Sequence, residues 1–260
     1  MRNFSFFILL AFFFVACQNS SQTAAEESTP EETPAKKYTL TPFTASTAYP
    51  DAKMESMTYA NGQFNFGVSN YELGAQTPDA DQKMCANSGK GQHIHLIVDN
   101  QPYSAQYTNE FEYDIADGEH YLLAFLSRSY HESVKNSPAG MAKKISVANK
   151  SIGDMSDIEG PMLFYSRPKG TYVGEKDTKK VMLDFYVVNA ELSAGYKVKA
   201  DINGEEHIVD TWQPYYIEGM PMGENTITLT LLDADGNVVD APLNPVTRKF
   251  NLKADPVEAQ

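Results

Sequence analysis

Two histidines separated by one residue are the most chemically specific feature of the sequence. His93 and His95 lie in the run from Gly91 to Asn100, whose alternating pattern predicts a β-strand ending in a turn. Side chains two positions apart on a strand share a face, so the histidines share one face and the intervening apolar residues form the other. The apolar residues are Ile94, Leu96 and Val98. We therefore expect the two imidazoles to project from a non-core face into water.

Paired imidazoles on a strand can hold zinc or copper when a neighbouring segment supplies a third ligand. The same half of the chain holds three further candidates, which are His120, His131 and Cys85. By strand periodicity His120 starts on the core side, so it can join the pair only around the end of the sheet or if the strand register is shifted. The alternative is that these histidines are ordinary solvent-facing or hydrogen-bonded side chains, and spacing alone leaves both interpretations open.

The segments that must position these residues have the pattern of short strands. After about residue 40, runs rich in Phe, Tyr, Val, Ile and Thr alternate with polar residues and are bounded by Gly, Pro, Asn and Asp. No window shows a helical stripe of apolar residues. The pattern predicts an all-β protein built as antiparallel β-sandwiches.

Four stretches of the first half match four stretches of the second half in the same order, which predicts a duplicated sandwich domain. The stretches 66–73, 92–100, 118–126 and 141–147 match 185–192, 196–204, 223–231 and 246–252. In this alignment His93 and His95 correspond to Lys197 and Lys199. Lysine is rarely buried without a partner, so the histidine face is the non-core face in both copies.

A later strand of the first copy has an apolar outer face that the second copy lacks. Tyr121, Leu123 and Phe125 stand where the second copy has three threonines, at 226, 228 and 230. An apolar outer face marks a contact surface. It is either covered by the other domain or the long insertion, or it forms a groove that binds a protein, peptide or small-molecule ligand.

The polar run that follows this strand holds the residue types that bind phosphate. Ser127 and Arg128 could contact phosphate oxygens, which makes a phosphorylated peptide an alternative ligand. A hydrogen-bonded polar loop explains the same residues. The motifs of nucleophile elbows, phosphate-binding loops and zinc hydrolases do not occur in the sequence, so we expect no catalytic residues and no enzyme.

The amino-terminal residues predict export and a lipid anchor. Residues 1–16 have one basic residue and a short apolar run, as in a secretory leader, and Cys17 occupies the position of a lipidated cysteine. Residues 17–40 then form a polar, Pro-containing tether expected to be disordered. These features predict a protein of the cell envelope, held at a membrane, with the outer membrane as the expected place.

Charge and cysteine content narrow the classes of partner. Loss of the leader removes Arg2 and changes the formal net charge from −13 to −14. Such an acidic chain is unsuited to nucleic acid or to electrostatic docking on a membrane. With Cys17 acylated, Cys85 remains as a single thiol, so no intrachain disulfide is expected. We expect the first domain at 41–150, a linker and first strand region at 151–170, and the second domain at 171–260.

The chain resembles secreted Gram-negative lipoproteins that carry the label "phosphopeptide-binding protein". The resemblance lies in residues 70–74, 91–100, 124–133, 163–170 and 217–226. The first copy also resembles a secreted immunoglobulin-like family of unknown function, with a histidine-rich strand, a Gly-x-His strand start and a further histidine. The corresponding residues are His93, His95, Gly118, His120 and His131. This resemblance implies immunoglobulin-like sandwiches and no established reaction.

Overall fold

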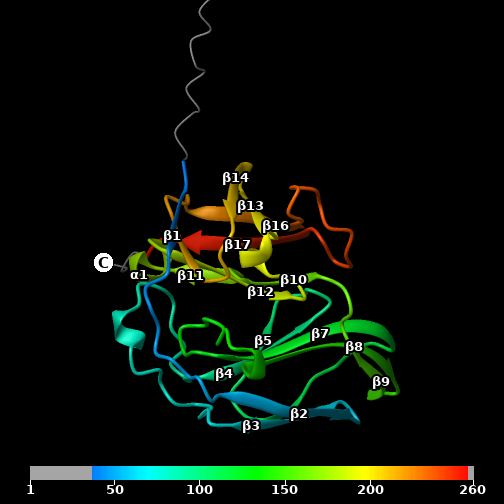
Figure 1. Ribbon diagram of the computed structural model, residues 1–260. Coiled ribbons are helices and arrows are strands. Elements are labelled where there is room, and N and C mark those ends of the chain that lie inside the picture. Colours follow the sequence, from blue (N-terminus) through cyan, green and yellow to red (C-terminus); the bar gives the residue numbers. More distant parts are fainter. Residues whose placement is uncertain (1–36, 257–260) are drawn as a thin grey trace, which may run out of the picture. The chain divides into compact units, whose positions relative to one another are not determined.

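Antiparallel sheets make up most of the described chain, as the alternating sequence pattern predicted. The computed structural model describes residues 37–256 (Figure 1). The predicted leader at 1–16, the predicted lipidation site Cys17 and the tether up to residue 36 lie outside these residues. No helix among the described residues is both long enough and apolar enough to cross a membrane. The prediction of an all-β fold made of antiparallel β-sandwiches is confirmed.

The first sandwich contains a three-stranded and a five-stranded sheet. The smaller sheet has the order β2 (Lys53–Ala60), β3 (Gln63–Ser69), β6 (Glu110–Glu112). The larger has the order β5 (Ser104–Gln106), β4 (His93–Val98), β7 (Gly118–Ser127), β8 (Gly140–Ala148), β9 (Ser151–Asp157). Alternate side chains of β4 and β7 point into the core between the sheets. That core includes Phe64, Phe66, Ile94, Leu96 and Leu122.

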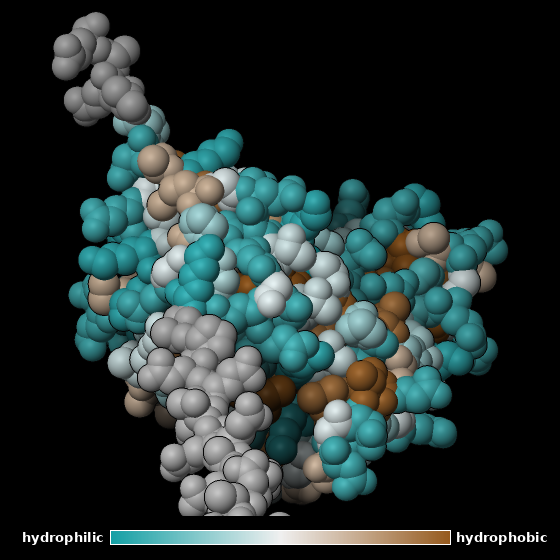
Figure 2. Space-filling view, turned by 90° about the horizontal axis from the view of Figure 1, so that it is seen from above, coloured by the Kyte–Doolittle hydropathy of each residue, from teal (hydrophilic) through white to brown (hydrophobic). Residues whose placement is uncertain are grey.

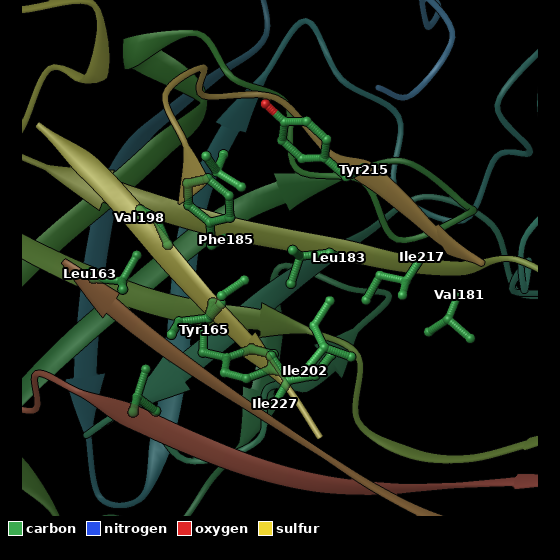
Figure 3. Close-up of a cluster of buried hydrophobic side chains, with 14 of the residues drawn as sticks. Leu163, Tyr165, Val181, Leu183, Phe185, Val198, Ile202, Tyr215, Ile217 and Ile227 are labelled. Atoms are coloured by element: carbon green, nitrogen blue, oxygen red, sulfur yellow. The ribbon is translucent and has the colours of Figure 1, made fainter. Parts of the chain in front are cut away.

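The second sandwich contains a four-stranded and a five-stranded sheet. The first has the order β1 (Thr39–Pro42), β15 (Tyr215–Glu218), β12 (Val181–Val188), β10 (Met162–Arg167). The second has the order β11 (Gly170–Val173), β17 (Val246–Lys253), β16 (Gly223–Leu232), β13 (Lys197–Ile202), β14 (Glu205–Val209). Figure 3 shows side chains from both sheets meeting in the core, among them Leu183, Phe185, Ile202 and Ile227.

The helical segments are short and lie in connections. They are the 3-10 turns η1 (Ala80–Gln82), η2 (Ser137–Ala139) and η3 (Leu192–Ala194), and the single-turn α1 (Glu175–Thr178). Segments of this length contribute little stability by themselves. The chemistry of the protein therefore depends on side chains that strands and loops position.

The two sandwiches share one pattern of strand pairing. In the first sandwich β7 pairs with β4 and β8, and in the second β16 pairs with β13 and β17, always antiparallel. Strand β1 starts inside the segment assigned to the tether and pairs with β15 of the second sandwich. Strand β9 extends the first sandwich, and β10 belongs to the second.

The outer face of β4 and β7 packs against the sheet that contains β10 and β12 (Figure 1). The residues that meet here are Ile97, Leu123, Phe125, Met162, Phe164 and Tyr186. Leu123 and Phe125 are fully buried, while Tyr121 at the edge stays partly exposed. The expectation that this face serves as a ligand groove is therefore wrong, because apolar strands of the second sandwich cover it.

The outer surface offers few apolar contacts. Figure 2 shows one face on which hydrophobic residues form small patches among hydrophilic side chains. The large apolar residues that are exposed are scattered along the described chain. They are Met84, Met155, Val173, Ile208, Met222, Val238 and Leu243. Single exposed apolar side chains are normal for a folded protein and do not mark a contact surface.

Candidate metal centre

Three histidines from two segments of the first sandwich converge on one point. The Nε2 atom of His93 lies 2.8 Å from Nε2 of His95 and 3.1 Å from Nδ1 of His131. One ring nitrogen from each of the three residues lies within 4.8 Å of the other two. These residues form the three-histidine cluster.

Strand register explains why His131, 36 residues after His95, joins the pair. Strands β4 and β7 run antiparallel, with His93 opposite Ser127 at the end of β7. The loop after β7 therefore starts beside His93. The backbone N–H of His131 donates to the Arg128 carbonyl at 2.8 Å and His131 has a φ of 70°, so the loop turns back toward the sheet. This left-handed conformation is uncommon outside glycine, although histidine tolerates it better than most residues.

Aromatic side chains enclose the three-histidine cluster. The ring of Tyr103 stacks on that of His95, with centroids 3.6 Å apart and planes 11° apart. The rings of Tyr107 and Phe125 lie 5.0 Å from His93 and 4.9 Å from His95, respectively. His93 and His95 have no exposed surface, whereas His131 is partly exposed.

The prediction that His93 and His95 point into water is wrong, although their face was assigned correctly. They lie opposite the core of the first sandwich, as the alternation required. That face is buried because the second sandwich and the segment around Tyr103 cover it. In the second sandwich, the corresponding Lys197 and Lys199 remain partly exposed.

All three imidazoles are held in the neutral form. Burial lowers the pKa of His93 to about 4, with a further lowering from the nearby positive charges of Arg167 and Lys169. Burial likewise lowers the pKa of His95 and of His131 well below the usual value for histidine, and the same two cations add to the effect. A metal ion binds the lone pair of neutral imidazole, so the cluster is in the ligating state at neutral pH.

The hydrogen bonds available to His93 show why the cluster suits a cation. The Nδ1–H of His93 donates to the Gly91 carbonyl at 2.8 Å, and a carbonyl can only accept. The Nε2 atom of His93 therefore carries a single lone pair, which faces nitrogens of both His95 and His131. One lone pair cannot accept two good hydrogen bonds, whereas a metal ion could receive a lone pair from each ring.

The distances also fit a metal centre after small shifts. Metal–nitrogen bonds of about 2.0 Å in a trigonal arrangement place nitrogens about 3.5 Å apart. The distances from Nε2 of His93 to the ring nitrogens of His95 and His131 would increase slightly, and the longest distance in the cluster would decrease by roughly an ångström. The backbone carbonyl of Gly91 orients the His93 ring, as outer partners of metal-bound histidines commonly do. The hydroxyl of Ser166 lies 3.4 Å from Nδ1 of His95.

The structure leaves two of the proposed ligands outside the cluster. His120 lies seven residues before Ser127 on the same strand, roughly 24 Å away along an extended chain. It contacts Asp99 and the Ala116 carbonyl instead. Cys85 packs among Phe43, Tyr130, Met182 and Tyr216. Burial raises the pKa of its thiol to about 12, so Cys85 is protonated at neutral pH and is not a thiolate ligand.

The residues proposed to bind phosphate are engaged within the protein. The Arg128 guanidinium donates to the carbonyls of Thr47 and Ser133, and it lies 3.5 Å from the carboxylate of Glu132. The Ser127 hydroxyl donates to the Arg128 carbonyl. Both side chains are buried. The expectation that they meet an external phosphate is therefore wrong, and the polar-loop interpretation describes them.

Sequence reasoning missed most of the residues that surround the cluster. Tyr103 directly precedes the short strand β5 and Tyr107 directly follows it, and no pattern in the sequence connects them with the histidines. Arg167 and Lys169 lie in the segment 151–170, for which the sequence predicts a linker and a first strand. The strand β10 that precedes Lys169 reaches the cluster only because the two sandwiches pack together.

Comparison with known proteins adds little to this description. No protein family model matches the chain, and no curated protein matches it. Fibronectin(III)-like modules of CbhA from Clostridium thermocellum are 16% identical, with 36% of this chain and 100% of that chain covered and a TM-score of 0.29. The extracellular domain of BT3049 from B. thetaiotaomicron is 10% identical, with 80% and 40% covered and a TM-score of 0.29. The central fibronectin-III array of RIM-binding protein is 9% identical, with 79% and 68% covered and a TM-score of 0.25.

Proposed function

We propose that this protein is a metal-binding protein that holds a copper or zinc ion with His93, His95 and His131. The observation that carries the proposal is the position of the His93 lone pair. It faces the ring nitrogens of both other histidines while Gly91 holds the opposite side of the ring. Imidazole nitrogen is a common ligand for both metals, and three such ligands leave one coordination position open.

The surroundings of the cluster support binding and not hydrolysis as its role. The ligands sit against aromatic rings, and His93 and His95 are fully buried. Ions would enter at the partly exposed His131. No carboxylate belongs to the cluster within residues 37–256, so the structure offers no general base beside the candidate ion.

The predicted leader and Cys17 set the cellular context of this proposal. We propose that the protein is lipid-anchored in the cell envelope, where residues 17–36 and the start of the described chain would connect the anchor to the sandwiches. Its function there would be to bind or carry the metal ion. The earlier idea of a ligand groove on the outer face of the first sandwich is not part of this proposal, because that face is covered.

Metal titration of the purified protein tests the proposal, with His131→Asn as the informative variant. Asparagine tolerates the left-handed backbone conformation at residue 131, so the exchange removes the imidazole with little backbone strain. We expect stoichiometric binding of one copper or zinc ion per chain by the parent. The variant should bind more than about a hundredfold more weakly, since loss of even an outer partner of a metal ligand costs 10- to 100-fold.

His120→Asn is the matched control because His120 lies outside the cluster. The His120→Asn variant should retain the metal affinity of the parent. Both variants keep Cys17 and Cys85, so a difference in their metal binding cannot come from the thiols. Far-UV and near-UV circular dichroism would confirm that each variant is folded. Equal metal content in the parent and in His131→Asn would contradict the proposal.

A further inference from the structure

The charges around the three-histidine cluster indicate which kind of ion it selects. We propose that the cluster prefers a monovalent soft cation, cuprous copper, over divalent zinc. This inference rests on the proposed metal-binding function and adds the identity of the ion. The argument depends on the charge of the ligands, the charge of their neighbours and the burial of the site.

The ligands themselves supply no negative charge. In the part of the chain that the structure describes, the cluster consists of three histidines, with no carboxylate and no thiolate. A neutral ligand set leaves the full charge of the ion uncompensated. The free-energy cost of moving an ion out of water grows with the square of its charge, so a divalent ion loses about four times as much as a monovalent one in the same buried place.

Two cations border the cluster. Arg167 is buried, and its guanidinium donates to the hydroxyl of Tyr172 at 2.7 and 3.2 Å. The ion pairs among residues 37–256 include neither Arg167 nor Lys169. The Nζ atom of Lys169 lies 4.1 Å from the centre of the Tyr103 ring, which stacks on His95.

Both cations lie close to the ligands. Lys169 stands over the tyrosine ring that stacks on His95. Arg167 directly follows Ser166, whose hydroxyl lies 3.4 Å from Nδ1 of His95. A metal ion bound to the cluster and a neighbouring side-chain cation repel each other in proportion to the charge of the ion.

Lys169→Leu tests this charge dependence without touching a ligand, and leucine adds no atom that could bind a metal ion. Binding would be measured for three ions separately: Cu(I) under anaerobic reducing conditions against a chromogenic chelator, Ag(I), and Zn(II). Removal of one positive charge should raise the affinities for Cu(I) and Ag(I) by about tenfold, and that for Zn(II) by about a hundredfold, because the energy scales with ion charge.

Lys90→Leu is the matched control. Lys90 also lies over a tyrosine that flanks the cluster, with Nζ 5.4 Å from the Tyr107 ring centre, but its side chain is exposed to solvent. Solvent and salt screen an exposed charge, so all three affinities should change by less than about twofold. Thermal unfolding of both variants would confirm that they fold as the parent does.

Two results would overturn the inference. If Lys169→Leu changes the monovalent and divalent affinities by the same factor, the charge does not govern selection. If it weakens Zn(II) binding, the cation holds an anionic co-ligand and does not exclude divalent ions. The His131→Asn titration separates this failure from failure of the proposed function. If His131→Asn binds all three ions as the parent does, the metal site itself is refuted. If His131→Asn loses metal binding and either result above is also found, only the preference for a monovalent ion is refuted.

Discussion

The Nε2 atoms of His93 and His95 lie 2.8 Å apart on a strand face that another sheet buries. Two neutral imidazoles in such contact can share one proton, and His131 adds a third nitrogen at 3.1 Å from His93. The arrangement depends on both sandwiches, because strands of the second one close the face on which the histidines stand. The burial of the cluster therefore depends on the contact between the two sandwiches.

Tyr103 should support the cluster through its ring and not through its hydroxyl. The ring stacks on His95, while the hydroxyl lies 3.3 Å from Nδ1 of His131. We expect Tyr103→Ala to weaken metal binding by about 10- to 100-fold, as loss of an outer partner of a metal ligand commonly does. Tyr103→Phe, the matched control, should change it by less than about threefold. Competition titration with a metal chelator measures both. Equal weakening in the two variants would instead identify the hydroxyl as a ligand.

Asn100 should link the stability of the two sandwiches. Its side chain donates to the Leu163 carbonyl at 2.8 Å and accepts from the Tyr165 N–H at 2.8 Å, and it is buried. Asn100 has a φ of 55°, so Asn100→Gly removes the side chain without backbone strain. Loss of two buried hydrogen bonds should lower the free energy of unfolding by about 2–4 kcal/mol.

Asn149→Gly is the control for Asn100, because Asn149 has a φ of 50° and is exposed. It should change the free energy of unfolding by less than about 0.5 kcal/mol. Urea denaturation followed by tyrosine and tryptophan fluorescence measures both variants. Similar midpoints for the two variants would show that the Asn100 side chain does not stabilise the contact.

His120 should make the protein less stable as the pH rises. Burial alone would lower the pKa of His120, but its hydrogen bonds to the Asp99 carboxylate, at 2.6 Å, and the Ala116 carbonyl raise it above the usual value. Both partners only accept, so both ring nitrogens donate when the imidazole is protonated. The folded protein then binds more protons than the unfolded chain above about pH 6.5. The stabilisation is complete below that pH and is lost as the pH rises through the raised pKa.

Asp99→Asn isolates this effect and suits the φ of 49° at residue 99. We compare the free energy of unfolding of the parent with that of the variant at each pH. The excess of the parent over the variant should be about 1 kcal/mol larger at pH 6 than at pH 8.5, because the ion pair exists only at the lower pH. Urea denaturation at the two pH values measures this difference. A gap that is independent of pH would show that the charge of His120 contributes nothing.

Much of the candidate site could be read from local patterns. Alternation placed His93 and His95 on the face opposite Ile94 and Leu96, and the structure agrees. The sequence pattern did not show that β4 and β7 pair with each other. Their antiparallel pairing places the loop with His131 beside His93 and His120 at the far end of the sheet. The set of ligands therefore depends on that pairing.

The sequence by itself determined the strands and the faces of their side chains, because alternation and turn residues act over a few neighbouring positions. Only the tertiary structure decided that the histidine face is buried and that Arg167 and Lys169 border it. Those facts depend on the packing of β10 and β12 against β4 and β7, between residues at least 35 positions apart along the chain (162 − 127). An apolar outer face in the sequence indicates that another segment covers it. Several segments of the chain could cover this face, and the shape complementarity of the two sheets decides which one does.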